Sequence, residues 1–154
     1  KNITMADLTT TVTESVVLNG ALRGNTNSVT TTGINNVFER ILTCVNSQTT
    51  TVAVFGTAPY SAAGAIDVQN ARYIRITNLD SAAWIEVAVV TATTNYQVLL
   101  TPGNSHILCQ AEGVAVGEAD SAPAFTNLGD LASIQVRPVG VSFDPQVSVF
   151  VAAV

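Results

Sequence analysis

The fold of this chain is decided by one stretch, Arg72-Tyr73-Ile74-Arg75-Ile76-Thr77-Asn78-Leu79-Asp80-Ser81-Ala82-Ala83-Trp84-Ile85-Glu86-Val87. Apolar and polar residues alternate on both sides of Asp80-Ser81, and alternation with a period of two is typical of a half-buried β-strand. With these two residues at the centre of a turn, Ile76 pairs with Ile85 on one face and Arg75 pairs with Glu86 on the other. The stretch therefore predicts a β-hairpin.

The composition of the whole chain agrees with a β-sheet protein. Valine and threonine dominate, and β-branched side chains pack well on a pleated surface. A length of 154 residues suits one domain, which can bury enough apolar surface to fold without disulfides or metals. Only 11% of the residues are charged, which suits either a neutral polar surface or a surface covered by other subunits.

A second turn follows at Pro102-Gly103, where proline fits the first and glycine the second central position of a type II turn. Strands on both sides of this turn predict another hairpin. Its register pairs Val98 with Ile107, Tyr96 with Cys109, and Leu99 with His106.

Residues 34 to 45 are compatible with two structures. Their apolar side chains fall at the spacing of an amphipathic helix, but a strand from Val37 to Val45 is the alternative. We favour the strand, because Thr43-Cys44-Val45 prefers extended structure and a turn at Asn46-Ser47-Gln48 leads at once into a β-rich run, Thr50 to Phe55.

Further strands are expected at Thr9 to Leu18, Ser28 to Thr32, Leu131 to Arg137 and Gln146 to Val154, with long loops at Gly56 to Asn70 and Ala111 to Asn127. About eight to ten short strands without a convincing helix predict an all-β, single-domain antiparallel β-sandwich that is jelly-roll-like. We expect residues 1–8 to form an N-terminal arm or upstream sequence, and residues 9–154 to form the domain.

The charge pattern argues against several classes of partner. The formal net charge is −5 and the five arginines are scattered, whereas nucleic-acid binding requires clustered Lys and Arg. The apolar residues are interspersed with threonines, and no stretch reaches the roughly 18–20 apolar residues of a membrane span. We therefore expect neither a nucleic acid nor a membrane as partner.

Catalysis is not expected either. His106 is the one histidine, and its neighbour Ser105 should point to the opposite face of a strand, so the two cannot form a nucleophile–base pair. Glu112, Glu118 and Asp120 share one loop, for which a solvated acidic loop is favoured over a calcium site. We expect no enzyme activity, no catalytic residues and no cofactor-binding residues.

No metal site is expected, because Cys44 and Cys109 are the only cysteines and cannot fill a four-ligand site. Cys109 follows Ile107-Leu108 and is interpreted as a small core residue, with a Cys44–Cys109 disulfide as the alternative. Trp84 and Tyr73 fall on the same face of the predicted hairpin. They suggest either a sugar-stacking platform or a face that a second sheet or a neighbouring subunit covers, and the covered face is favoured.

Three stretches resemble a group of small virion proteins from tailed bacteriophages. They are Met5-Ala6-Asp7-Leu8-Thr9-Thr10-Thr11-Val12-Thr13-Glu14-Ser15-Val16, Arg72-Tyr73-Ile74-Arg75-Ile76-Thr77-Asn78-Leu79-Asp80 and Phe125-Thr126-Asn127-Leu128-Gly129-Asp130-Leu131. The resemblance implies a minor structural, capsid-decoration or tail-associated component. The motifs are structural patterns and carry no chemical signature.

The leading hypothesis is a capsid decoration, or cement, protein on the outside of the virion, which bridges neighbouring major capsid proteins. Its partners would be the major capsid protein and further copies of itself, with a homotrimer favoured. The alternatives are a tail or fibre component, or a carbohydrate-binding adhesin module.

Overall fold

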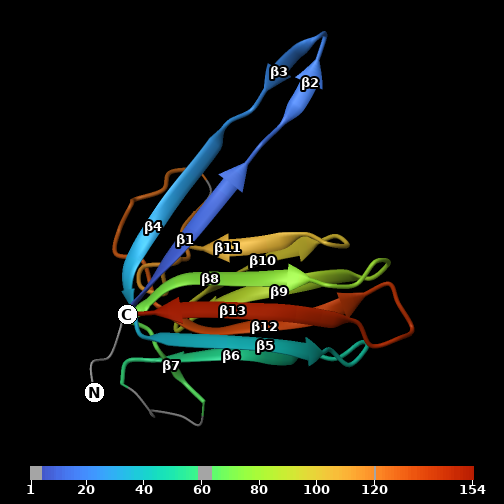
Figure 1. The fold of residues 1–154 in the computed structure, drawn as a ribbon. Helices are drawn as coiled ribbons and strands as arrows, with labels where there is room; N and C mark the ends of the chain where they lie inside the picture. The colour runs from blue at the N-terminus through green and yellow to red at the C-terminus, as the bar shows by residue number, and fades with distance from the viewer. Residues whose placement is uncertain (1–4, 59–63, 120) are drawn as a thin grey trace.

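The computed structural model describes residues 5–58, 64–119 and 121–154, and the expectations for Lys1 to Thr4 and for Asp120 lie outside them. All regular elements of the described residues are β-strands (Figure 1). They are β1 (Ala6–Thr13), β2 (Val16–Leu18), β3 (Ala21–Arg23), β4 (Thr26–Ile34), β5 (Asn36–Thr43), β6 (Thr50–Gly56), β7 (Ile66–Asp67), β8 (Ala71–Asn78), β9 (Trp84–Thr91), β10 (Asn95–Leu100), β11 (Ser105–Leu108), β12 (Leu131–Val139) and β13 (Gln146–Ala153).

Two sheets form a β-sandwich, which confirms the fold class that the sequence predicts. One sheet has the strand order β10-β9-β12-β6-β7 and the other has the order β11-β8-β13-β5. Alternate side chains of each strand enter a shared core, and the rest face outward. The largest fully buried side chains of this core include Ile74, Ile76, Ile85, Val87, Val89, Ile134, Val147, Val149 and Val151.

The pairing of the sandwich strands is nested along the chain. The strand β5 pairs with β13, β6 with β12, β8 with β11, and β9 with β10, all antiparallel. The ladders β13–β8 and β12–β9 then join these pairs into two sheets. Among these eight strands, only β9 and β10 follow each other in the chain and also lie in the same sheet. The other connections between them cross from one sheet to the other.

The predicted hairpin of residues 72–87 is wrong, because β8 and β9 lie in opposite sheets. Ile76 and Ile85 are both fully buried, but they reach the core from the two sides of the sandwich. Arg75 lies opposite Ile107 and Phe150, and Glu86 lies opposite Arg137. The alternation of apolar and polar residues shows which face of a strand is buried. The predicted hairpin and the observed sandwich bury the same face, so the alternation does not distinguish between them.

The side chain of Asn78 explains why the chain crosses the sandwich at this point. Its Nδ2 donates to the carbonyl oxygens of Ala83 at 2.7 Å and Leu100 at 3.1 Å, and its Oδ1 accepts from the Asp80 backbone N–H at 3.0 Å. The Oδ1 of Asp80 accepts from the backbone N–H groups of Ala82 and Ala83, both at 2.8 Å. These hydrogen bonds stabilise the connection between β8 and β9, which is longer than a two-residue turn.

The predicted hairpin around Pro102-Gly103 is also wrong, although the turn itself is present. Gly103 has a φ of 77°, and the Asn104 N–H donates to the Thr101 carbonyl at 3.1 Å, as in a type II turn. However, β10 and β11 belong to different sheets, so this turn is a second crossing.

The strand interpretation of residues 34–45 is confirmed by β5, and the next strand by β6. These two strands again lie in opposite sheets. The strands expected near both ends of the chain are present as β1, β2, β4, β12 and β13. The predicted loop at Gly56 to Asn70 includes the short strand β7, which pairs in parallel with β6.

The correction to the first hairpin can be tested by a double-mutant cycle on Arg75 and Glu86. We expect the coupling free energy between Arg75→Ala and Glu86→Ala to be indistinguishable from zero, because side chains far apart contribute independently. A cross-strand pair in a hairpin would instead couple by about 0.2–1 kcal/mol. Urea unfolding of the four proteins gives the coupling, and Glu86 with Arg137, which do lie opposite each other, is the positive control.

Candidate interaction site

A long β-hairpin projects from one end of the sandwich (Figure 1). The strands β1 and β4 pair over Ala6 to Ile34, and β2 and β3 pair at the far end. We call residues 6–34 the arm and residues 16–23 its tip. The sequence predicts an N-terminal arm or upstream sequence for residues 1–8, and in the structure the strands up to Ile34 lie outside the two large sheets.

The local sequence explains how the arm turns back. Asn19 and Gly20 have φ values of 50° and 76°, the positive angles that a two-residue type I′ turn requires at both central positions. Gly24, with a φ of 112°, lies between β3 and β4, and a Cβ there would overlap the carbonyl oxygen of Glu14. The Glu14 N–H in turn donates to the Asn25 carbonyl at 2.8 Å, which connects the two halves of the arm.

The two faces of the arm differ in chemistry. One face carries a ladder of hydroxyl groups, in which Thr11 bonds Ser28 at 2.8 Å and the Thr9–Thr30 and Thr13–Thr26 pairs lie at 3.4 and 3.3 Å. The alternate residues form the opposite face, which we call the apolar face and where three apolar side chains lie among two hydroxyls and one amide. That face contains Leu8, Thr10, Val12, Asn27, Val29 and Thr31.

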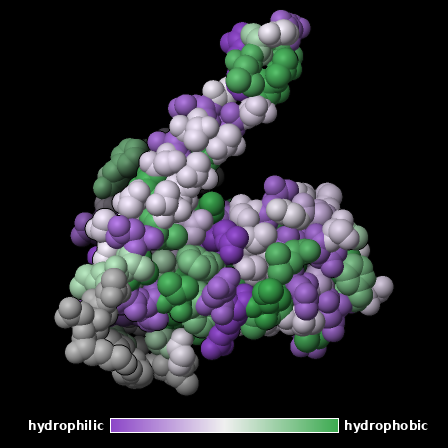
Figure 2. Space-filling view, in the orientation of Figure 1, coloured by the Kyte–Doolittle hydropathy of each residue, from purple (hydrophilic) through white to green (hydrophobic). Residues whose placement is uncertain are grey.

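The tip is apolar and exposed. Val16, Val17, Leu18 and Leu22 have exposed fractions of 56%, 69%, 59% and 72%. Figure 2 shows hydrophobic residues gathered at the end of the arm, clear of the sandwich. Exposed aliphatic side chains on neighbouring positions of a small protein commonly indicate a contact surface.

A cleft lies between the apolar face of the arm and the outer face of the β11-β8-β13-β5 sheet. Its larger part has a volume of about 380 Å³, and its sheet side is formed by Arg72, Tyr73, Ile107 and Cys109. The arm contributes Thr10, Val12, Asn27, Val29 and Thr31 to the same part of the cleft. A second part of about 350 Å³ lies beside β1, where Glu39, Tyr73, Arg75 and Phe150 line the sheet side.

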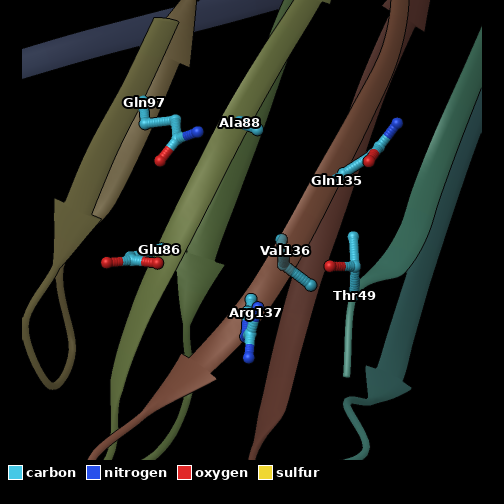
Figure 3. A pocket seen from close by; sticks show the side chains of 7 residues that line it. All are labelled: Thr49, Glu86, Ala88, Gln97, Gln135, Val136 and Arg137. Carbon is cyan, nitrogen blue, oxygen red and sulfur yellow. The ribbon is translucent and has the colours of Figure 1, made fainter. Parts of the chain in front are cut away.

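A polar hollow lies on the outer face of the other sheet (Figure 3), with a volume of about 220 Å³. The small side chain of Ala88 lies opposite Gln97 on one side and Gln135 on the other, so the sheet surface is lower there. Glu86 and Arg137 lie opposite each other in the next row. The hollow offers hydrogen-bonding groups to a polar ligand. Its residues come from separate strands, so no local pattern in the sequence predicts it.

The prediction that Trp84 and Tyr73 share one face is wrong, and with it both the favoured covered face and the alternative of a sugar-stacking platform. Trp84 is 49% exposed and belongs to β9, whereas Tyr73 belongs to β8 of the opposite sheet, on the side where the cleft lies. Tyr73 packs edge-on against Phe150, with ring centroids 6.0 Å apart. The two aromatic side chains therefore cannot stack on one sugar.

His106 connects the edges of the two sheets. Its Nε2 lies 3.1 Å from the hydroxyl oxygen of Tyr96, which belongs to β10 in the other sheet. Its neighbour Ser105 instead bonds Thr77 at 2.7 Å. The two side chains thus have separate partners, as the strand periodicity predicts, and do not form a nucleophile–base pair. The predicted pairings of Tyr96 with Cys109 and of His106 with Leu99 are wrong, since Tyr96 pairs with Val89 and His106 with Ile76.

Partial burial lowers the pKa of His106 below its usual value of 6.5. The unfolded chain therefore binds a proton more readily than the folded chain as the pH falls through about 6.5. We expect the free energy of unfolding, measured with urea, to decrease between pH 7.5 and pH 5.5. The decrease should level off below the lowered pKa, where both states carry the proton.

The matched control is His106→Gln, which removes the one histidine of the chain. This variant should have a flat stability profile over the same pH range. Hydrogen bonds from the backbone N–H groups of Ala83 and Ala82 lower the pKa of Asp80, and one from the Ala124 N–H lowers the pKa of Glu118. These two carboxyl groups therefore affect the stability only at more acidic pH. An unchanged slope in His106→Gln would exclude His106 as the source.

The acidic loop is stabilised by its own hydrogen bonds. Glu118 accepts from the Ala124 backbone N–H and, at 2.8 Å, from the Thr126 hydroxyl. Among the described residues, no three His, Cys, Asp or Glu side chains form a group that could hold a metal ion. Glu118 therefore has a structural role within the loop.

Both cysteines are free, so the alternative of a disulfide is wrong. Cys44 is fully buried, and burial raises the pKa of its thiol to about 11. Cys109 is exposed at the cleft, so its interpretation as a core residue is wrong. It follows the last residue of β11, where the strand alternation that motivated the interpretation has ended.

Over the part of the chain described by the structure, no helix has the length and apolar character needed to cross a membrane. No protein-family model matches the chain, and neither the curated proteins nor the solved structures that were compared with it include a match.

Proposed function

We propose that this chain is a non-enzymatic structural protein of a virion, which binds the outside of a phage capsid and bridges neighbouring major capsid proteins. The observation that carries the proposal is the arm, roughly 40 Å long for 13 residues of extended chain. A compact sandwich with a projecting, apolar-tipped hairpin can contact two neighbours at once. A bridging protein of this kind stabilises an assembled shell by mass action, because it binds only the assembled state.

The stretches that resemble phage virion proteins support the same proposal by their positions. Met5 to Val16 covers β1 and the start of the tip, and Arg72 to Asp80 covers most of β8 and the connection after it. These segments contribute to the two sides of the cleft. Two of the three stretches therefore contribute to the cleft, whereas the third, Phe125 to Leu131, is not part of its lining.

We further propose that the sandwich is a jelly roll and that the protein acts as a homotrimer at threefold positions of the capsid. The nested pairing of β5 with β13, β6 with β12, β8 with β11 and β9 with β10 supports the jelly roll, since such a fold wraps one long antiparallel ribbon into two sheets. The trimer follows from the symmetry of the proposed binding site.

Cryo-electron microscopy of the phage particle that contains this chain tests the proposal. The expected result is ordered density for the sandwich on the capsid lattice, in contact with at least two major capsid subunits. Particles made without the protein should release their DNA at a lower temperature. Density restricted to the tail or fibres would instead support the alternative of a tail component and would contradict the capsid role.

A further inference from the structure

We propose that the tip of the arm binds in the cleft of a second copy of this chain. This inference goes beyond the proposed function, since it identifies a contact between copies that does not depend on a capsid. It assigns the exposed tip residues and the cleft beside β8 and β11 to one interface.

The exposed surface area of the molecule is large enough for contacts with two further copies. The chain exposes 9442 Å², whereas a compact monomer of 16.0 kDa is expected to expose about 7,400 Å². The excess of about 2,000 Å² is more than the roughly 1,600 Å² that two standard contacts, at about 800 Å² per partner each, would remove from one copy. A copy that both inserts its tip and receives another tip takes part in two such contacts.

The shapes and polarity of the two surfaces match. An apolar cavity of about 150 Å³ accommodates one benzene-sized group. The larger part of the cleft, at about 380 Å³, therefore has room for at least two aliphatic side chains of a tip. Val12 and Val29 of the receiving arm and Ile107 of its β11 are exposed by 50%, 56% and 42%, and a bound tip would remove them from water.

The few charges near these surfaces are complementary. Glu14 lies two residues before the tip and Arg23 ends it, so this end of the arm carries one charge of each sign. The cleft is lined by Arg72, Arg75 and Glu39, so it offers an opposite charge to both Glu14 and Arg23. Arg72 donates to the Gln69 carbonyl at 2.7 Å, and Arg75 donates weakly to Ser148 at 3.4 Å, so neither bond neutralises its charge.

A second copy explains the tip better than a lipid surface does. Hairpins and helices that insert into the membrane interface usually carry tryptophan, tyrosine or several basic residues. The tip, residues 16–23, contains no tryptophan or tyrosine and a single basic residue, Arg23, and the chain has a net charge of −5. Anionic lipids would therefore repel the molecule as a whole.

Cysteine cross-linking of the full chain tests the interface directly. The variant Leu22→Cys places a thiol on the tip, and Cys109 supplies the native thiol at the cleft. Under mild oxidation we expect most of the protein to become disulfide-linked between copies, with position 22 joined to Cys109 in peptide maps. The double variant Leu22→Cys/Cys109→Ser should not form these species. Thr51→Cys, which places a thiol on an exposed site of β6 in the other sheet, is the matched control.

A second measurement does not depend on cysteine. Sedimentation of the wild-type protein should show a concentration-dependent oligomer, and Leu22→Asp should sediment as a 16.0 kDa monomer. Leu22 is 72% exposed, so this change should leave the circular dichroism spectrum and the unfolding midpoint of the sandwich unchanged. Thr51→Asp should sediment as the wild type does.

Three results would overturn the proposal. The first is a wild-type protein that stays monomeric at about 100 μM, a concentration well above the dissociation constant of a specific contact. The second is a set of cross-links that join position 22 only to itself. The third is binding of the wild-type monomer, but not of Leu22→Asp, to phosphatidylserine vesicles. All of these measurements use purified protein without capsids. A failure here is therefore distinguishable from a failure of the capsid role, which the particle reconstruction tests.

Discussion

Asn78→Asp is expected to lower the free energy of unfolding by about 3–5 kcal/mol at pH 7, the range found when a buried polar group loses its partner and a charge is left uncompensated. Asn78 is fully buried, and its Nδ2 donates to two backbone carbonyls, those of Ala83 and Leu100. An aspartate would replace this donor by a carboxylate oxygen that faces both carbonyl oxygens. Urea unfolding followed by circular dichroism measures the change.

The matched control for this experiment is Asn95→Asp, at an exposed position where β10 begins. The same chemical change there should alter stability by less than about 0.5 kcal/mol, as is usual for surface positions. The deficit of Asn78→Asp should become smaller toward acid pH, because protonation restores a donor and removes the charge. Equal effects at the two positions would contradict the role assigned to Asn78.

Ile76→Ala is expected to lower the free energy of unfolding by about 2–5 kcal/mol, through lost burial and the cavity that remains. Ile76 is fully buried in β8, where it enters the core shared by both sheets. Ile41→Ala removes the same atoms from β5, in the same sheet, but Ile41 is 64% exposed. We expect less than about 1 kcal/mol for Ile41→Ala.

The comparison of the two isoleucines distinguishes the observed strand β5 from the helix that the sequence left open for residues 34–45. Both structures bury Ile76, but only the sandwich places β5 beside β13 with Ile41 on the outer face. The helix that the sequence left open would instead place Ile41 on its apolar side. A large effect of Ile41→Ala would therefore contradict the strand assignment of β5.

The sequence was sufficient to predict most strands of the sandwich and the buried faces of β8 and β9. Ile74, Ile76, Ile85 and Val87 all enter the core as the alternation indicated. The sequence did not predict which strand lies beside which, because alternate burial is satisfied equally by a neighbour in the sheet and by a strand across the core. The hydrogen bonds of Asn78, which involve residues 5 and 22 positions away, decide between these arrangements.

The arm was only partly predictable. Asn19-Gly20 between two Val- and Thr-rich runs is a strong signal of a two-residue hairpin turn, and it identifies the arm in retrospect. The exposure of Val16, Val17 and Leu22 could not be predicted, because aliphatic residues in a strand are normally expected in a core. The cleft is formed by segments from the beginning and middle of the chain, so no local pattern indicates it.

The separation of the arm from the core divides the molecule into two units of unequal stability. A two-stranded ribbon with little apolar burial is marginally stable alone, whereas the core strands of a sandwich typically exchange their amide hydrogens with free energies close to that of global unfolding. We therefore expect the amide hydrogens of β1 and β4 to exchange with solvent orders of magnitude faster than those of β9 and β12. If the tip binds a second copy, exchange in the arm should slow as the protein concentration rises. Assembly would then complete the folding of the arm, and the arm amides would report association residue by residue.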